Sequence, residues 1–172
     1  MGGLESPMQD EKMTKEYYIN IYKDDVTKLM KYIPYLEKKS GNDVSHDYQD
    51  GNMSSTMAVP VYDGTLLNFV KEAGDTAFMD RNYPYFYTRN RIDTLRDEMH
   101  AIEHADIMHM EALCCILSKY VLGGRTKAHL WKEGVENRIF LEILKKAKEC
   151  MEFWNDPLGA EVGNMINNLS KQ

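Results

Sequence analysis

Apolar residues recur at intervals of three and four along most of the chain, which is the spacing of one face of an α-helix. The clearest stripes cover residues 26–36, 66–78, 92–120 and 139–154, and a weaker one covers residues 162–169. Pro34 lies inside the first stripe and should kink or shorten that helix, because proline removes a backbone donor. The pattern therefore predicts an all-α chain.

The segments between the stripes predict where the helices end. Residues 40–55 are rich in Ser, Gly, Asn and Asp, and an aromatic loop is expected over residues 82–87. Residues 56–62 form a short strand at most, because Pro60 cannot donate to a sheet. We expect a flexible tail over residues 1–14 and a single helical domain over residues 15–172. That domain should hold five to six helices in an orthogonal or bundle-like packing.

The longest stripe, over residues 92–120, carries two polar residues on its apolar face. Asp106 and His109 occupy seam positions, and residues three apart are neighbours on a helix. A buried carboxylate needs a partner, which is either His109 or Arg125, brought back by the Gly123–Gly124 turn. We expect Asp106, His109 and Arg125 to form a structural polar anchor rather than a catalytic centre.

The composition is that of a globular protein, with 43% apolar and 28% charged residues in a chain of 172. The formal net charge of −6 argues against a large nucleic-acid interface, which needs a concentrated basic surface. Three cysteines, of which Cys114 and Cys115 are adjacent, form no disulfide framework and indicate reduced thiols. No apolar run approaches the ~20 residues of a membrane span, and residues 1–16 do not resemble a signal peptide. These features predict a soluble, cytoplasmic protein that does not enter a membrane.

Histidines and carboxylates are concentrated between residues 97 and 111. On a helix Asp97, His100, His104 and Glu111 share one face, the arrangement that brings metal ligands together. Such a set suits zinc or iron and would support a metal-dependent helical hydrolase. The face lies nearly opposite the apolar seam, however, and the chain has no HExxH motif. A solvated polar surface without a cofactor is therefore the preferred interpretation.

Aromatic residues alternate with arginines between residues 81 and 91. Their arrangement would allow them to stack single-stranded bases or to contact a protein; the residues are Tyr83, Tyr85, Phe86, Tyr87, Arg89 and Arg91. The other interpretation is a loop folded over the core, with its tyrosine hydroxyls in water. Among the binding functions, the acidic net charge favours a protein partner or self-association over nucleic acid.

Several short motifs occur in the second half of the chain: Ala105-Asp106-Ile107, Ala112-Leu113, Gly123-Gly124-Arg125 and the segment 139–144. In these motifs the chain resembles a prokaryotic family of domains of unknown function, the one numbered 6508, which often occurs on phages and mobile elements. Arg138 stands where that family usually has glycine, and Thr126 stands where it usually has an aromatic residue. The resemblance implies a small, mainly helical fold, and it implies no activity.

Two functions of different classes follow from these observations. The preferred one is a non-enzymatic protein-interaction or accessory domain, associated with a phage or mobile element in line with the resemblance. The alternative is a metal-dependent hydrolase that uses the face with Asp97, His100 and His104.

Overall fold

The computed structural model describes residues 7–40, 45–47 and 60–155, and this part of the chain is mainly helical, as predicted. Its eight α-helices are α1 (Pro7–Leu29), α2 (Ile33–Lys39), α3 (Gly64–Gly74), α4 (Tyr83–Arg89), α5 (Leu95–Glu103), α6 (Glu111–Gly123), α7 (His129–Glu136) and α8 (Ile139–Asn155). They exceed the five or six expected because two predicted helices are each divided and residues 83–89 are helical rather than a loop. The last predicted helix, at residues 162–169, lies outside the described residues.

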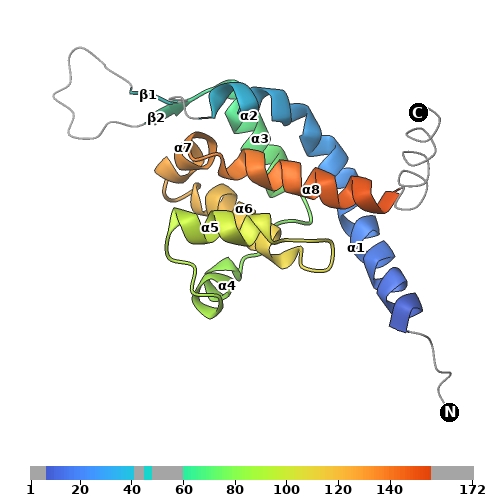
Figure 1. The fold of residues 1–172 in the computed structure, drawn as a ribbon. Coiled ribbons are helices and arrows are strands. Elements are labelled where there is room, and N and C mark those ends of the chain that lie inside the picture. Colours follow the sequence, from blue (N-terminus) through green and yellow to red (C-terminus); the bar gives the residue numbers. More distant parts are fainter. Residues whose placement is uncertain (1–6, 41–44, 48–59, 156–172) are drawn as a thin grey trace, which may run out of the picture.

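Two helices hold the centre of the fold. Helix α6 contacts α3, α4, α5, α7 and α8, and helix α8 contacts α1, α2, α5, α6 and α7. Figure 1 shows α8 crossing between α1 and α2 on one side and α5 and α7 on the other. The central turns of α6 are buried on every side, from Leu113 to Ser118. This explains why the residues of α6 are apolar almost without interruption, as expected of a helix with neighbours all around it.

The first helix begins well before the expected start. Helix α1 starts at Pro7, so residues 7–14, expected in a flexible tail, are helical; residues 1–6 lie outside the described residues. Its regular hydrogen bonding stops at Leu29, and a 3-10 turn leads to α2, whose first turn contains Pro34. The predicted interruption at this proline is confirmed.

A short antiparallel pair of strands extends from the helical body. Strand β1 (Ser45–Asp47) pairs with β2 (Pro60–Tyr62), with His46 opposite Val61. The second strand lies in the segment where a strand was expected, whereas β1 was expected to be part of a polar loop. Tyr62 fixes the hairpin to the body, because its hydroxyl donates to the Ala128 carbonyl and its ring lies 5.6 Å from that of Trp131.

The prediction of one long helix over residues 92–120 is wrong at the middle of that range. Helices α5 and α6 are separate, and the segment 104–110 between them is not helical. Asp106 causes much of this interruption, because its carboxylate accepts from the Met108 amide at 2.8 Å, and such a local bond competes with helix formation. The side chains of Asp106 and His109 are 58% and 76% exposed, so neither occupies the buried seam position that was expected.

The glycines after α6 lie where the helix was expected to end. Helix α6 ends at Gly123, and Gly124 follows as its C-cap in right-handed conformation. A Cβ atom on Gly124 would overlap the indole of Trp131, whose Nε1 donates to the Val121 carbonyl at 3.1 Å. Glycine is therefore required for close approach rather than for an unusual φ. Trp131, five residues beyond Thr126, thus places an aromatic ring against this turn.

Arg138 occupies a backbone conformation that favours glycine. Its φ is 63°, and its amide donates to the Val135 carbonyl at 3.1 Å, one of the bonds that close a helix through a left-handed residue. The glycine that is usual here in the resembling family is thus explained by the left-handed turn between α7 and α8.

Among the described residues, no helix has both the length and the apolar character needed to cross a membrane.

Candidate functional site: a groove between α1, α4, α5 and α6

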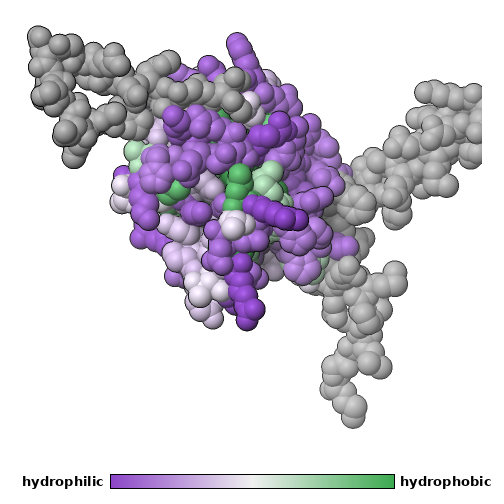
Figure 2. Space-filling model, turned by 60° about the vertical axis from the view of Figure 1, so that its left-hand side comes forward, coloured by the Kyte–Doolittle hydropathy of each residue, from purple (hydrophilic) through white to green (hydrophobic). Residues whose placement is uncertain are grey.

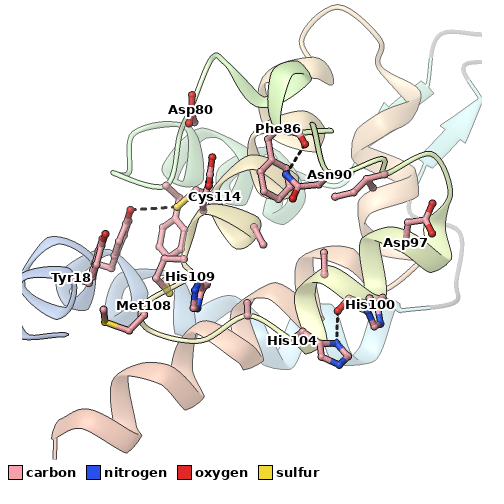
Figure 3. Close-up of a pocket in the computed structure, with 18 of the residues that line it drawn as sticks. Tyr18, Asp80, Phe86, Asn90, Asp97, His100, His104, Met108, His109 and Cys114 are labelled. Atoms are coloured by element: carbon pink, nitrogen blue, oxygen red, sulfur yellow. Dashed lines mark hydrogen bonds between the residues drawn. The ribbon is translucent and has the colours of Figure 1, made fainter. Parts of the chain in front are cut away.

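A groove of about 660 Å³ opens between four helices and the loop that joins α5 to α6. Figure 3 shows Tyr18 of α1 at one end and Asp97 and His100 of α5 at the other. Phe86 and Asn90 of α4 form one long wall, and the α5–α6 loop forms the opposite wall. A cavity of this volume is within the range that binds small ligands or anchoring side chains.

Apolar and polar atoms contribute about equally to the accessible lining of the groove. The rings of Tyr22 and Phe78 lie 4.9 Å apart and bring α1 against the loop before α4. Phe86 and Met110 are buried side chains of the lining, and Figure 3 shows Cys114 of α6 between Phe86 and Tyr18 of α1. The sequence alone does not bring these residues together, because they come from three helices and two loops.

All four residues of the predicted metal site line the groove, yet two of them serve the backbone. Asp97 caps the first turn of α5: its carboxylate accepts from the amides of Asp93 and Thr94, at 3.0 and 3.1 Å. These bonds lower the pKa of the Asp97 carboxyl, because they favour its charged form. His104 is exposed, and its Nδ1 lies 2.9 Å from the His100 carbonyl oxygen, so Nδ1 carries the hydrogen of this bond.

The remaining two residues of that set are not arranged as ligands. The rings of His100 and His104 lie against each other, with centroids 4.0 Å apart. Glu111 stands on a different helix, α6, where its carboxylate pairs with Arg89 of α4 at 2.8 Å. Within residues 7–40, 45–47 and 60–155, no group of three or more histidines, cysteines or carboxylates is placed to hold a metal ion.

The aromatic and arginine segment forms a helix, α4, because Pro84 in its first turn is compatible with helical backbone. Phe86 points into the core and Tyr87 is half-buried, so these two do not belong to an exposed patch. Tyr85 is 68% exposed, and the guanidinium of Arg89 lies 5.6 Å from its ring centre. Tyr83 is half-buried as well, so the exposed residues of the predicted patch are Tyr85 and Arg89 on α4 and Arg91, which lines the groove.

The predicted anchor of Asp106, His109 and Arg125 does not form as a unit. His109 Nδ1 does lie 2.7 Å from the Asp106 carboxylate, but the pair is exposed in the α5–α6 loop. Arg125 is elsewhere, with its guanidinium over Gly74 of α3. Because α5 and α6 are separate helices, the Asp106 carboxylate lies in an exposed loop and does not need a buried partner.

A buried anchor is present, but it is centred on Glu98, which was not singled out from the sequence. Glu98 is 3% exposed and accepts from the hydroxyls of Tyr87 and Tyr120, at 2.6 and 2.8 Å. The Lys119 ammonium lies 3.3 Å from the same carboxylate. Burial and the adjacent Glu98 charge raise the pKa of both tyrosines. The signal was available, because Glu98 shares a helical face with Leu95 and Ile102.

The Glu98 cluster fixes the geometry of the groove. It joins α4 through Tyr87, α5 through Glu98 and α6 through Lys119 and Tyr120, which are three of the helices that line the groove. None of the four cluster residues lines the groove itself. The cluster is therefore a structural support behind the site.

The thiols at this site are poor nucleophiles. Burial raises the pKa of Cys114 to about 11 and that of Cys115 to about 12. Cys114 Sγ lies 3.5 Å from the Tyr22 hydroxyl, and Cys115 Sγ lies 3.7 Å from Asp80. Because the thiolate is the reactive form, neither residue is activated for covalent catalysis near neutral pH.

The exposed surface offers no broad apolar area on the face shown in Figure 2. That face is mostly hydrophilic, and hydrophobic residues appear only as small separate patches. Among the residues whose exposure is described, the large exposed hydrophobic ones are Tyr17, Leu67, Tyr85 and Leu95.

A family model described as "Family of unknown function (DUF6508)" matches residues 21–153, a range that includes every residue of the groove except Tyr18. No curated protein and no solved structure matches the chain significantly.

Proposed function

Starting from the fact that the chain belongs to the DUF6508 family of unknown function, we propose that it is a non-enzymatic protein-interaction domain whose groove binds an apolar segment of a partner protein. The observation that carries the proposal is the groove itself: about 660 Å³ of open space lined by both apolar and polar side chains.

The hydrogen bonds of the rim favour binding over catalysis. Asp97 is used as a helix cap, His104 is bonded to backbone, and Glu111 is paired with Arg89. A general acid or base needs a group that is free to exchange a proton with a bound substrate. The metal-dependent alternative requires three protein ligands around one point, and the described part of the chain provides no such group.

The residue types around the groove favour a protein segment as the ligand. The partly exposed Met79 and Met108 line it, and flexible methionine side chains adapt to different apolar partners. The Tyr85–Arg89 pair stands on the same helix, α4, that forms one wall. Tyrosine and arginine are enriched at the energetic centres of protein interfaces, and the net charge of −6 disfavours nucleic acid.

A displayed library of random peptides, selected on the purified full chain, tests the proposal. Ala101 lines the groove and is half-buried, so Ala101→Phe should fill the space and abolish binding of the selected peptides. Leu67→Ala, on α3 and outside the groove, is the matched control and should bind them normally. Circular dichroism would verify that both variants are folded. The proposal is overturned when no peptide is enriched, or when the enriched peptides bind Ala101→Phe as well as the wild type.

A further inference from the structure

We infer that the segment bound in the groove carries a carboxylate and that Arg91 is the residue that binds it. This inference rests on the proposed function and adds to it the chemical class of the partner. It starts from the backbone at Arg91, which has a φ of 54° at the rim of the groove.

Arg91 occupies the left-handed position of a helix-ending motif. Helix α4 ends at Arg89 with Asn90 as its C-cap. The Ile92 amide then donates to the Tyr87 carbonyl at 2.9 Å, and the Arg91 amide donates to that of Thr88 at 3.3 Å. This pair of bonds is the Schellman motif, in which glycine usually occupies the left-handed residue because a Cβ atom is strained there.

An arginine in this position destabilises the turn relative to glycine. Strained backbone is retained where the surrounding structure fixes it, and such residues are concentrated at binding and active sites. Arg138 provides the comparison inside the same chain, since it has a φ of 63° at the equivalent end of α7. Its guanidinium pairs with Glu142 at 3.0 Å, so its side chain has a structural partner.

Among the described residues, Arg91 has no such partner. No hydrogen bond, ion pair or ring contact joins its guanidinium to another residue within the described ranges, although the side chain is exposed at the groove. The acidic groups that line the groove with it are engaged: the Asp97 carboxylate accepts from two backbone amides, and Glu111 pairs with Arg89. The Asp80 carboxylate accepts from the Asn82 amide at 2.8 Å. Within the described part of the chain, a positive charge at the groove is therefore left without a partner.

The planar guanidinium defines the chemistry of its ligand. Arginine binds a carboxylate through two parallel hydrogen bonds, a geometry that lysine cannot reproduce. Apolar surface begins directly beside it, because Ile92 and Phe86 also line the groove. The matching ligand is a peptide with an apolar anchor next to an acidic group, which is either an Asp or Glu side chain or the terminal carboxylate.

The experiment compares Arg91→Gly with Arg138→Gly, using peptides selected from the displayed library. Both substitutions relieve a left-handed position and should each raise Tm by about 2–4 °C, the shift expected for about 1 kcal/mol in a chain of this size. Arg91→Gly should weaken peptide binding about ten- to a hundredfold, the value of a charge-assisted hydrogen bond. Arg138→Gly should leave binding unchanged, and Arg91→Lys should recover only part of the affinity.

Synthetic variants of one selected peptide identify the source of the carboxylate. Replacing Asp or Glu by its amide tests the side chain, and amidating the C-terminus tests the terminal group. One of the two peptide changes should weaken binding to the wild-type protein about as much as the Arg91→Gly substitution does. The same peptide change should have little further effect on the affinity for the Arg91→Gly variant. Peptides that bind in the groove but are indifferent to Arg91→Gly and to both amide changes would overturn this inference while leaving the proposed function intact. If the selected peptides bind the Ala101→Phe variant as well as the wild type, the proposed function is overturned instead.

Discussion

Removing the Glu98 carboxylate should destabilise the protein more than removing any exposed charge. In Glu98→Ala the hydroxyls of Tyr87 and Tyr120 lose their acceptor, and Lys119 loses its counter-ion. A buried polar group without a partner costs about 1–3 kcal/mol, and Tyr120 is only 3% exposed. Two such groups, together with the space left by the side chain, give an expected loss of about 3–5 kcal/mol in the free energy of unfolding.

Urea denaturation followed by circular dichroism measures this loss. Asp106→Ala is the matched control, since Asp106 is also a carboxylate on the α5–α6 side of the molecule but is exposed. It should change stability by no more than about 0.5 kcal/mol. Glu98→Gln keeps an acceptor for one hydroxyl and should cost about 1–2 kcal/mol, less than the alanine variant.

A double-mutant cycle tests whether the loss comes from the hydrogen bonds. Tyr120→Phe alone should cost about 1.5–3 kcal/mol, as for a hydrogen bond to a charged group. In the background of Glu98→Ala the same change should be nearly neutral, because no acceptor remains. The reasoning is refuted when Glu98→Ala costs as little as Asp106→Ala, or when the two substitutions are additive.

Three further perturbations follow from the same structure. Arg138→Gly should stabilise the fold by about 1 kcal/mol, because glycine accepts the left-handed φ and the exposed pair with Glu142 contributes little; a lower urea midpoint would contradict this. Gly134→Ala should cost about 1–3 kcal/mol, since its Cβ would overlap the fully buried ring of Phe140; an unchanged midpoint would show that the ring can move. Burial raises the pKa of three thiols from 9.0 to about 11 or 12, so unfolding above pH 9 releases protons from them. The free energy of unfolding should therefore fall as the pH rises from about 9 to 11. The urea midpoint measures this fall, and a midpoint that does not change with pH would contradict it. The residues concerned are Cys114, Cys115 and Cys150.

The helical periodicity of the sequence was sufficient to predict most of the described helices, because each buries one face against α6 or α8. The same periodicity cannot detect a break that keeps the spacing nearly intact. Ile102, Ile107, Met110 and Leu113 are all buried although the backbone between α5 and α6 is not helical. Asp106 was the available warning, since aspartate forms local turns that compete with a helix.

Contacts between helices account for the failure to identify the anchor. Glu98 lies on the apolar face of its own helix, which the spacing reveals, but its hydroxyl partners come from α4 and α6. Tyr87 was expected in a loop, and loop residues carry no predicted orientation. Asp106 was preferred because a polar residue in a seam needs a partner, and that requirement is sound; it applied to Glu98 instead.

The residues of the predicted metal face all line one groove, but their hydrogen bonds give them other roles. Asp97, His100 and His104 do lie near one another, and Glu111 lines the same groove. What a titratable group can do depends on its hydrogen-bond partners, and here those are a helix terminus, a backbone carbonyl and an arginine. Those partners can only be identified after the chain has folded. Among the described residues they leave the Arg91 guanidinium at the groove without a partner, and the proposed ligand carboxylate rests on that observation.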